Sequence, residues 1–430
     1  MDLKNLTAQL LSEYENFEEN GIKHRRFKHT DLQPLISKLK ENNLFDVEKI
    51  GESVEGREIS LIKVGKGSKK ILAWSQMHGD EPTATMALFD FFNFLHISES
   101  YSEIIDLLLN NITMYFIPML NPDGAEKYTR RNALDIDLNR DAGRLVSPEA
   151  QILKKLRDKI EPDLGLNLHN QNTRYTVGKT NQQVAISFLS PSYNFAKDIN
   201  DVRSKTMQLI VEVKKVLDNY IGGHIAKYDD AFEPRAYGDN MIKWGTPTLL
   251  VETGGWLGDV EDKFLRKINF IIILSGLISI INESYKSADI KDYYAIPNNG
   301  PLMFDLLLRN CVINSNGSQY KIDIGINTNE LNTADYKSFY FEGKIEDLGD
   351  LSTFNGLKEI DCSGLKVVYG NSMSEEMKNT GNKNLPKIPD KLKTDNKKVK
   401  IGNYANLRLL ENGNVKFSII NGFVFEQNEK

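Results

Sequence analysis

Two histidines and two glutamates stand at positions in the sequence where metal chemistry is expected. His78 and Glu81 are three residues apart on a turn after an apolar run, and His169 follows a second apolar run. Two imidazoles and one carboxylate form a ligand set that holds catalytic zinc and leaves a fourth position for water. Glu252, after a third apolar run and before two glycines, is the candidate base that accepts and returns a proton. The pattern predicts a hydrolase with one Zn2+ ion.

Further polar motifs lie between Glu81 and His169. Residues 121–124 are Asn-Pro-Asp-Gly, residues 130–132 are Arg-Arg-Asn, and residues 137–140 are Asp-Leu-Asn-Arg. We expect these motifs and the histidines to follow the ends of strands. Ligands of open α/β sheets bind outside the carboxyl ends of the strands, so the motifs are expected to form one site.

The motifs, taken in this order, resemble those of the M14 zinc carboxypeptidases. The matching segments are His-x-x-Glu (78–81), Asn-Pro-Asp-Gly (121–124), Arg-x-Asn (130–132), Asp-x-Asn-Arg (137–140), a strand-end His and a strand-end Glu. A set of several such motifs in order is far more specific than any one of them. The resemblance implies a zinc metallocarboxypeptidase and the fold of that family.

The resemblance also implies catalytic roles. His78, Glu81 and His169 would hold the zinc ion, and Glu252 would act as general base and then as general acid. Arg130 would stabilise the negative charge that develops on the carbonyl oxygen. Asp137 would orient His78 through the second ring nitrogen of the imidazole, as a carboxylate behind a metal ligand commonly does.

The substrate-binding residues follow from the same resemblance. Asn139 and Arg140 would bind the terminal carboxylate of the substrate, for which a planar guanidinium is suited. Arg131 is adjacent to Arg130 and is an alternative for its role. The family's substrate-capping tyrosine is left open between Tyr228 and Tyr237, and Tyr237 is our candidate.

The elements that must position these residues alternate between strands and helices. Apolar runs indicate strands at 59–64, 71–74, 112–117, 164–168 and 248–251, and helices follow Pro82 and span 148–160, 199–219 and 262–285. Alternation of this kind predicts an α/β fold with a mixed, mostly parallel sheet sandwiched by helices. The catalytic domain is expected at residues 1–290, with a helical lead-in at its N-terminus.

The residue pattern of the sequence changes near residue 297. Short β-like runs follow, so residues 297–430 are expected to form a small β-rich accessory domain. Residues 371–400 are rich in lysine and asparagine and predict a mobile loop.

The composition excludes some classes of function. A net charge of −5 gives no support for a nucleic-acid or anionic-membrane partner. The N-terminus shows no apolar signal segment, so we expect a cytoplasmic protein. The apolar stretch 268–281 is short and interrupted by polar residues, which favours a buried helix over a membrane span. The sequence does not indicate the oligomeric state.

Three functions remain open. The first is a zinc carboxypeptidase that cuts the amide bond next to a free carboxylate in short peptides or cell-wall peptides. The second is an N-acyl amino acid deacylase of the aspartoacylase and succinylglutamate desuccinylase type. The number of residues between Glu81 and His169 is close to the corresponding spacing in that branch of the family. The third is a non-catalytic binding protein on the same scaffold. The expected partner is therefore a peptide or an N-acyl amino acid.

Overall fold

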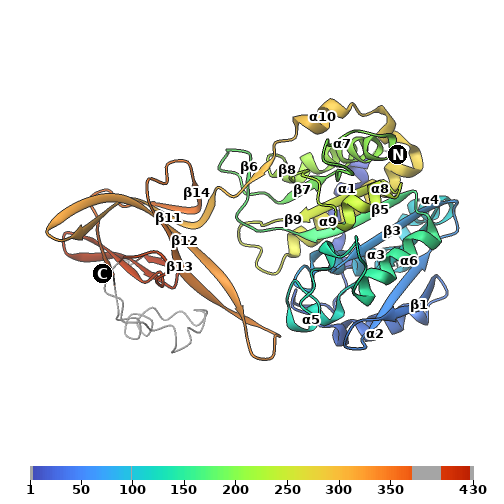
Figure 1. Ribbon diagram of the computed structural model, residues 1–430, viewed down its shortest axis with the longest axis horizontal. Helices are drawn as coiled ribbons and strands as arrows, with labels where there is room; N and C mark the ends of the chain where they lie inside the picture. The colour runs from blue at the N-terminus through green and yellow to red at the C-terminus, as the bar shows by residue number, and fades with distance from the viewer. Residues whose placement is uncertain (1–2, 98, 370–398, 427–430) are drawn as a thin grey trace. The chain divides into compact units, whose positions relative to one another are not determined.

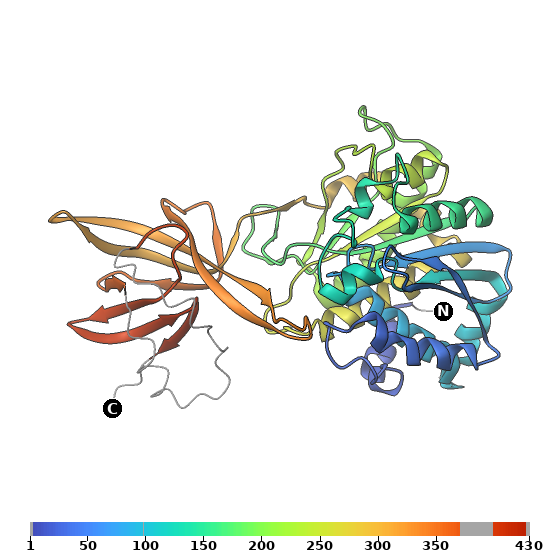
Figure 2. The ribbon, with the colours of Figure 1, turned by 60° about the horizontal axis from the view of Figure 1, so that its bottom comes forward.

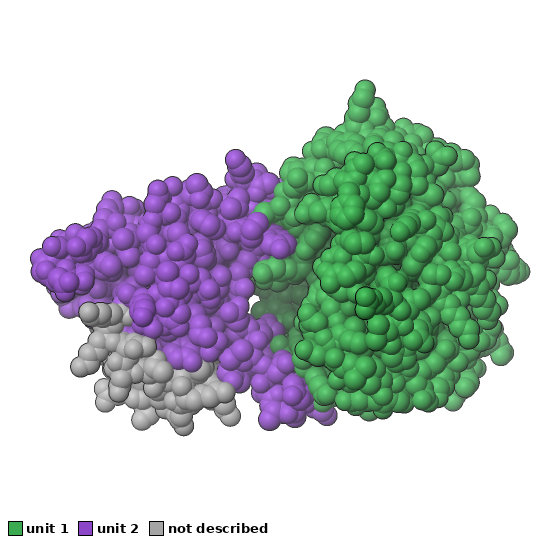
Figure 3. All heavy atoms as spheres, in the orientation of Figure 1, with its two compact units in different colours: residues 1–173, 182–300 green, residues 174–181, 301–430 purple. Residues whose placement is uncertain are grey.

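The computed structural model describes residues 3–97, 99–369 and 399–426. The chain divides into two compact units, which Figure 3 colours separately. Unit 1 contains residues 1–173 and 182–300, and unit 2 contains residues 174–181 and 301–430. The short segment 174–181, which follows shortly after His169 in the sequence, thus belongs to the same unit as the C-terminal region.

Unit 1 is built on an eight-stranded sheet in the order β1-β2-β4-β3-β5-β9-β7-β8. The four central strands β4, β3, β5 and β9 are parallel, and antiparallel pairs occur toward both edges. This arrangement confirms the mixed, mostly parallel sheet. The bounds are β1 Phe45–Glu52, β2 Glu58–Val64, β3 Lys69–Ser75, β4 Ile112–Ile117, β5 Leu164–Asn170, β7 Ile186–Leu189, β8 Ile225–Lys227 and β9 Thr248–Thr253.

Helices cover both faces of this sheet (Figures 1 and 2). Strand β3 shows the two-sided burial: Ile71 and Ala73 enter one hydrophobic core, and Leu72 and Trp74 enter another. The first core is closed by α3 (Thr83–Ile97), α4 (Ser102–Asn111), α7 (Asp201–Ile221) and α9 (Lys263–Asn282), and the second by α6 (Pro148–Ile160) and α8 (Tyr237–Lys243). The predicted sandwich of helices around the sheet is confirmed.

The remaining elements of unit 1 are short. They are α1 (Leu3–Ser12), α2 (His29–Lys40), α5 (Pro122–Lys127), α10 (Ile290–Ala295), the 3-10 helices η1 (Tyr14–Asn16), η2 (Glu99–Tyr101), η3 (Leu138–Arg140) and η4 (Ser284–Ser287), and β10 (Asn299–Gly300). Helices α1 and α2 form the N-terminal lead-in, and Leu10 and Leu32 of these helices are fully buried in the first core.

Helix α9 contains the most apolar stretch of the chain. By length and composition it passes the test for a membrane span, but 83% of its most apolar window is buried inside the protein. Ile268, Phe270 and Ile271, for example, are fully buried in the first core. The helix therefore packs as the buried core helix that its sequence predicts.

Unit 2 is β-rich, as expected for the C-terminal region. Its main sheet has the order β13-β12-β11-β15-β16-β17-β18, with β14 paired to β11. The bounds are β11 Met303–Ser315, β12 Ser318–Asn332, β13 Phe339–Gly349, β14 Asn355–Asp361, β15 Lys366–Tyr369, β16 Leu407–Glu411, β17 Asn414–Ile420 and β18 Phe423–Glu426, with β6 Thr176–Val177 in the short segment. Arg174 anchors that segment, with Nη2 3.0 Å from Asp305 Oδ2. The predicted loop at 371–400 lies almost wholly outside the described residues.

Candidate active site

The turn after β3 carries the first two candidate ligands, His78 and Glu81. Its shape depends on Gly79, because a Cβ atom there would lie 2.0 Å from the backbone carbon of Gly124 and 2.2 Å from the backbone nitrogen of Ala125. Only glycine permits so close an approach of two backbone segments. The turn closes with a hydrogen bond from the Glu81 amide to the His78 carbonyl at 3.2 Å.

His169 and Glu252 are brought together by the sheet itself. They lie near the ends of the parallel strands β5 and β9, and they are direct partners in the register of this pair. Their preceding neighbours Leu168 and Val251 enter the first core, so His169 and Glu252 project from the opposite face. His169 is buried and Glu252 is half-buried.

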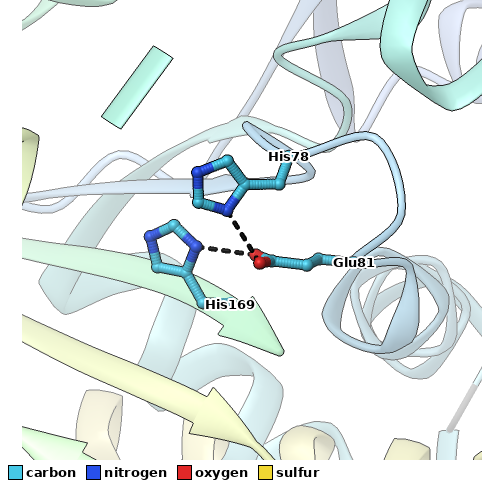
Figure 4. Close-up of side chains that lie close together, drawn as sticks. All are labelled: His78, Glu81 and His169. Atoms are coloured by element: carbon cyan, nitrogen blue, oxygen red, sulfur yellow. Dashed lines mark hydrogen bonds and ion pairs between the residues drawn. The ribbon is translucent and has the colours of Figure 1, made fainter. Parts of the chain in front are cut away.

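Figure 4 shows how the three candidate ligands converge. Both imidazoles point toward the Glu81 carboxylate: His78 Nδ1 lies 2.7 Å from Oε1, and His169 Nδ1 lies 2.7 Å from Oε2. The ligand atoms of the three side chains all lie within 4.8 Å of one another. His78 and His169 are each 1% exposed and Glu81 is 7% exposed, so the cluster is withdrawn from bulk water.

The donor set of this cluster fits a catalytic zinc ion. It offers two imidazole nitrogens and one carboxylate, and zinc in hydrolases commonly takes three protein ligands of these types. Burying a charged side chain is costly unless the charge is paired or the side chain binds a metal ion. His78, Glu81 and His169 are therefore the residues that would hold the ion.

Asp137 and Arg130 complete the surroundings of His78. Asp137 Oδ1 lies 3.2 Å from His78 Nε2, the ring nitrogen that faces away from Glu81, and Asp137 Oδ2 accepts a hydrogen bond from Arg130 Nε at 3.0 Å. Arg130 Nη1 lies 3.1 Å from His78 Nδ1 and 3.5 Å from Glu81 Oε1. The structure thus places Asp137 where it orients His78, and places the Arg130 guanidinium beside the ligands.

Burial and the charges of the cluster shift the pKa values of its side chains. Burial raises the pKa of Glu81, but His78 and His169 outweigh this effect and hold that pKa well below its usual range. Burial lowers the pKa of His169. Burial also raises the pKa of Glu252 well above its usual value, and the negative charge of Glu81 adds to the rise.

The Asn-Pro-Asp-Gly motif is a scaffold for the ligands. Asn121 caps α5 by accepting a hydrogen bond from the Gly124 amide at 2.9 Å, and its Nδ2 donates to the carbonyls of Met77 and Arg130 at 3.3 Å. One side chain therefore ties the turn that carries His78 to the loop that carries Arg130. Asp123, fully enclosed, accepts hydrogen bonds from the Ser53 hydroxyl and the Glu55 amide.

The predicted carboxylate-binding residues Asn139 and Arg140 follow Asp137 in the short helix η3. Asp137 starts this helix by accepting a hydrogen bond from the Asn139 amide at 2.9 Å. Asn139 Oδ1 accepts from the Tyr237 amide at 2.8 Å, and Arg140 Nη1 donates to the Asn139 carbonyl at 2.7 Å. Because Asp137 caps η3, these two residues are close in the chain to the groups around His78.

The structure does not bring the side chains of two predicted substrate-binding residues, Tyr237 and Arg131, to the ligand cluster. Tyr237 is fully buried in the second core, and its hydroxyl donates to the Ala150 carbonyl, so its ring packs under α6 and its backbone amide alone serves the site. Arg131 donates from Nη1 to the Asp135 carbonyl at 2.8 Å and lies against Asp135 in its own loop. Of the adjacent arginines, Arg130 is the one directed to the ligands.

Two residues of the site escape prediction from the sequence. Glu233 Oε2 lies 3.4 Å from Arg140 Nε, and Arg235 donates to Glu233 from Nε and Nη2 at 2.9 and 2.8 Å. The polar segment before the Glu252 strand is a recognisable loop, but no local pattern indicates an ion pair with a residue 93 positions earlier.

The His-Glu-His cluster and the half-buried glutamate lie at the strand ends of an α/β sheet, where ligand and metal sites of such folds are found. Residues 35–143 match the sequence model of the zinc carboxypeptidase family, which confirms the resemblance carried by the motifs. The matched region contains His78, Glu81, Arg130, Asp137 and the residues of η3, and it ends before His169 and Glu252.

Individual relatives are similar over a limited part of the chain. Carboxypeptidase SOL1 of Arabidopsis thaliana is 31% identical over 98 residues, which are 21% of this chain and 20% of that protein. Probable carboxypeptidase 2 of Trichophyton verrucosum is 26% identical over 115 residues, which are 26% of this chain and 20% of that protein. The matched segment thus spans about a fifth of the length of these relatives.

Solved metallocarboxypeptidases are similar to this chain at low sequence identity. The metallo-carboxypeptidase from Burkholderia cenocepacia has a TM-score of 0.47 and 16% identity over 60% of this chain and 70% of that chain. Bovine thrombin-activatable fibrinolysis inhibitor has a TM-score of 0.49 and 13% identity over 62% of this chain and all of that chain.

Proposed function

We propose that the chain is a zinc-dependent carboxypeptidase that hydrolyses the amide bond next to a free carboxylate in short peptides or cell-wall peptides. The observation that carries the proposal is the convergence of His78, Glu81 and His169, with Glu252 paired to His169 across adjacent strands. A zinc ion bound by this cluster supplies Lewis acidity and lowers the pKa of water toward about 7.

Three side chains near the candidate ligands are assigned parts in this reaction. Glu252 accepts the proton of the attacking water and later gives it to the departing amine, a part open to a carboxylate that lies beside His169 on the neighbouring strand. Arg130, 42% exposed and anchored by Asp137, presents its guanidinium where negative charge develops on the carbonyl oxygen. Asp137 keeps the His78 ring in one orientation.

Recognition of the substrate is assigned to η3. Arg140 binds the terminal carboxylate through its guanidinium, and the side-chain amide of Asn139 lies next to it in the chain. The carbonyl carbon to be attacked is then held between this carboxylate anchor and the zinc ligands. A substrate held at both ends in this way reacts with a smaller entropic cost.

The test is a comparison of matched substrates with the zinc-loaded full chain. We expect hydrolysis of peptides with a free C-terminus and little or none of the same peptides with an amidated C-terminus, measured by release of the terminal amino acid. Turnover of N-acyl amino acids alone would instead establish the deacylase. Equal rates on free and amidated peptides would remove Arg140 from its assigned part.

A further inference from the structure

The guanidinium of Arg140 contacts two neighbours. Nη1 donates to the Asn139 carbonyl at 2.7 Å, and Nε lies 3.4 Å from Glu233 Oε2. A guanidinium has five N–H donors in a planar fork. The ion pair is on Nε and the hydrogen bond to Asn139 uses one hydrogen of Nη1, so neither contact involves Nη2.

Glu233 is itself held tightly on its loop. Arg235 donates to Glu233 from its backbone amide at 3.1 Å, from Nε at 2.9 Å and from Nη2 at 2.8 Å. The Glu233 amide donates to Asp239 Oδ1 at 3.0 Å. The hydrogen bonds from Arg235 lower the pKa of Glu233 to about 2, so the carboxylate is ionised at neutral pH.

The loop that carries Glu233 is fastened to the segment that carries Arg140. The Ala142 amide donates to the Arg235 carbonyl at 3.0 Å, and the Tyr237 amide donates to Asn139 Oδ1 at 2.8 Å. Asn240 Nδ2 closes the loop from the other side by donating to the Pro234 carbonyl at 2.9 Å. Glu233 is therefore placed near Arg140 by hydrogen bonds to Asn139 and Ala142, which lie on both sides of Arg140 in the chain.

We propose that Glu233 is a positioning residue for Arg140, which aims the guanidinium at the terminal carboxylate of the substrate. The inference rests on the proposed function. Arg235 offsets the charge of Glu233, so the three groups keep a net charge of +1 for an anionic ligand. Glu233 thus restricts the Arg140 side chain without cancelling the positive charge of the site, and a preorganised side chain costs less entropy on binding.

The experiment compares Glu233→Gln with the parent, both as zinc-loaded full chains, on a peptide with a free C-terminus. We expect KM to rise about tenfold and kcat to stay within about twofold, because the change affects substrate binding and leaves the chemical step intact. Glu233→Asp restores part of the lost affinity. Zinc content and Tm are expected to be those of the parent, which separates positioning from unfolding.

A matched control is Glu212→Gln on α7. Glu212 is paired with Lys215 at 2.6 Å and has a side chain 20% exposed, against 28% for Glu233. This control is expected to leave KM unchanged. An unchanged or lower KM in Glu233→Gln, in an enzyme that still prefers free over amidated C-termini, overturns the positioning role and leaves the proposed function intact. A parent that shows no such preference overturns the proposed function itself.

Discussion

The two ends of the candidate site are built differently. The proposed metal end is buried: its candidate ligands come from a strand end and a tight turn, and His78, His169 and Glu81 are at most 7% exposed. The carboxylate end is carried by η3 and a loop, and its central side chain, Arg140, is 39% exposed. In the proposed function, chemistry is thus placed on the sheet, whereas recognition is placed on connections that tolerate change.

The largest effect is expected at the metal end. Replacing a ligand in His169→Ala leaves two protein ligands, so the variant should lose zinc and its activity should fall about a thousandfold or more. Elemental analysis and a peptidase assay measure both quantities. Arg140→Gln is the contrast, since it should keep the full zinc content while losing affinity for substrate. Loss of zinc from Arg140→Gln would contradict the assignment of zinc binding and substrate binding to separate ends of the site.

The proton-transfer group is expected to matter nearly as much. Glu252→Gln preserves the shape of the side chain and removes the base, so kcat should fall by about 10²- to 10⁴-fold with zinc content unchanged. Steady-state kinetics on a free-C-terminus peptide gives the number. A variant that hydrolyses the peptide at the parent rate would show that another group moves the proton.

A pair of neighbouring arginines provides the next comparison. Arg130→Gln removes a guanidinium that lies 3.1 Å from His78 Nδ1, and kcat should fall by about a hundredfold. Arg131→Gln removes one that is bonded to the Asp135 carbonyl in its own loop, and activity should stay within about twofold. Comparable losses in both variants would contradict the assignment of Arg130.

The smallest effect concerns stability at the carboxylate end. Burial raises the pKa of Asp239 to about 7, above its ordinary value of 3.8. The folded protein therefore holds this proton more strongly than the unfolded chain, and the stability contributed by Asp239 decreases as the pH rises from about 4 to about 7. Asp239→Asn, which can still accept from the Glu233 amide, should raise Tm by a few degrees at pH 8 and change it little at pH 4.

Thermal unfolding at both pH values decides this prediction. A Tm difference that is the same at pH 4 and pH 8 would show that Asp239 does not titrate in this range. A lower Tm for the variant at pH 8 would show that the charged form of Asp239 holds the loop.

The metal end could be predicted from the sequence because its geometry is regular. His169 and Glu252 end apolar runs that form adjacent parallel strands, and the register of such strands brings the side chains together. His78 and Glu81 share one turn, so their spacing fixes their proximity. The sheet and its covering helices followed from the same alternation of strands and helices.

At the proposed carboxylate end the family resemblance indicates Asn139 and Arg140, but the surrounding contacts could not be predicted because loops lack a period. Adjacent residues such as Arg130 and Arg131 point in different directions, and nothing in their types says which faces the site. Tyr237 shows a signal that was available: with Met241 it forms an apolar face of α8, which predicts a core residue. Glu233 meets Arg140 only through the folding of two distant loops.

The two hydrogen bonds that Asn121 Nδ2 donates to the carbonyls of Met77 and Arg130 have a consequence for engineering. Because one amide couples the metal-bearing turn to the arginine loop, lengthening or shortening residues 125–129 would displace both together. On the proposed function, libraries that seek new substrates should therefore leave this connection at its present length and vary residues 231–236, where a change is expected to affect capture of the substrate more than its cleavage.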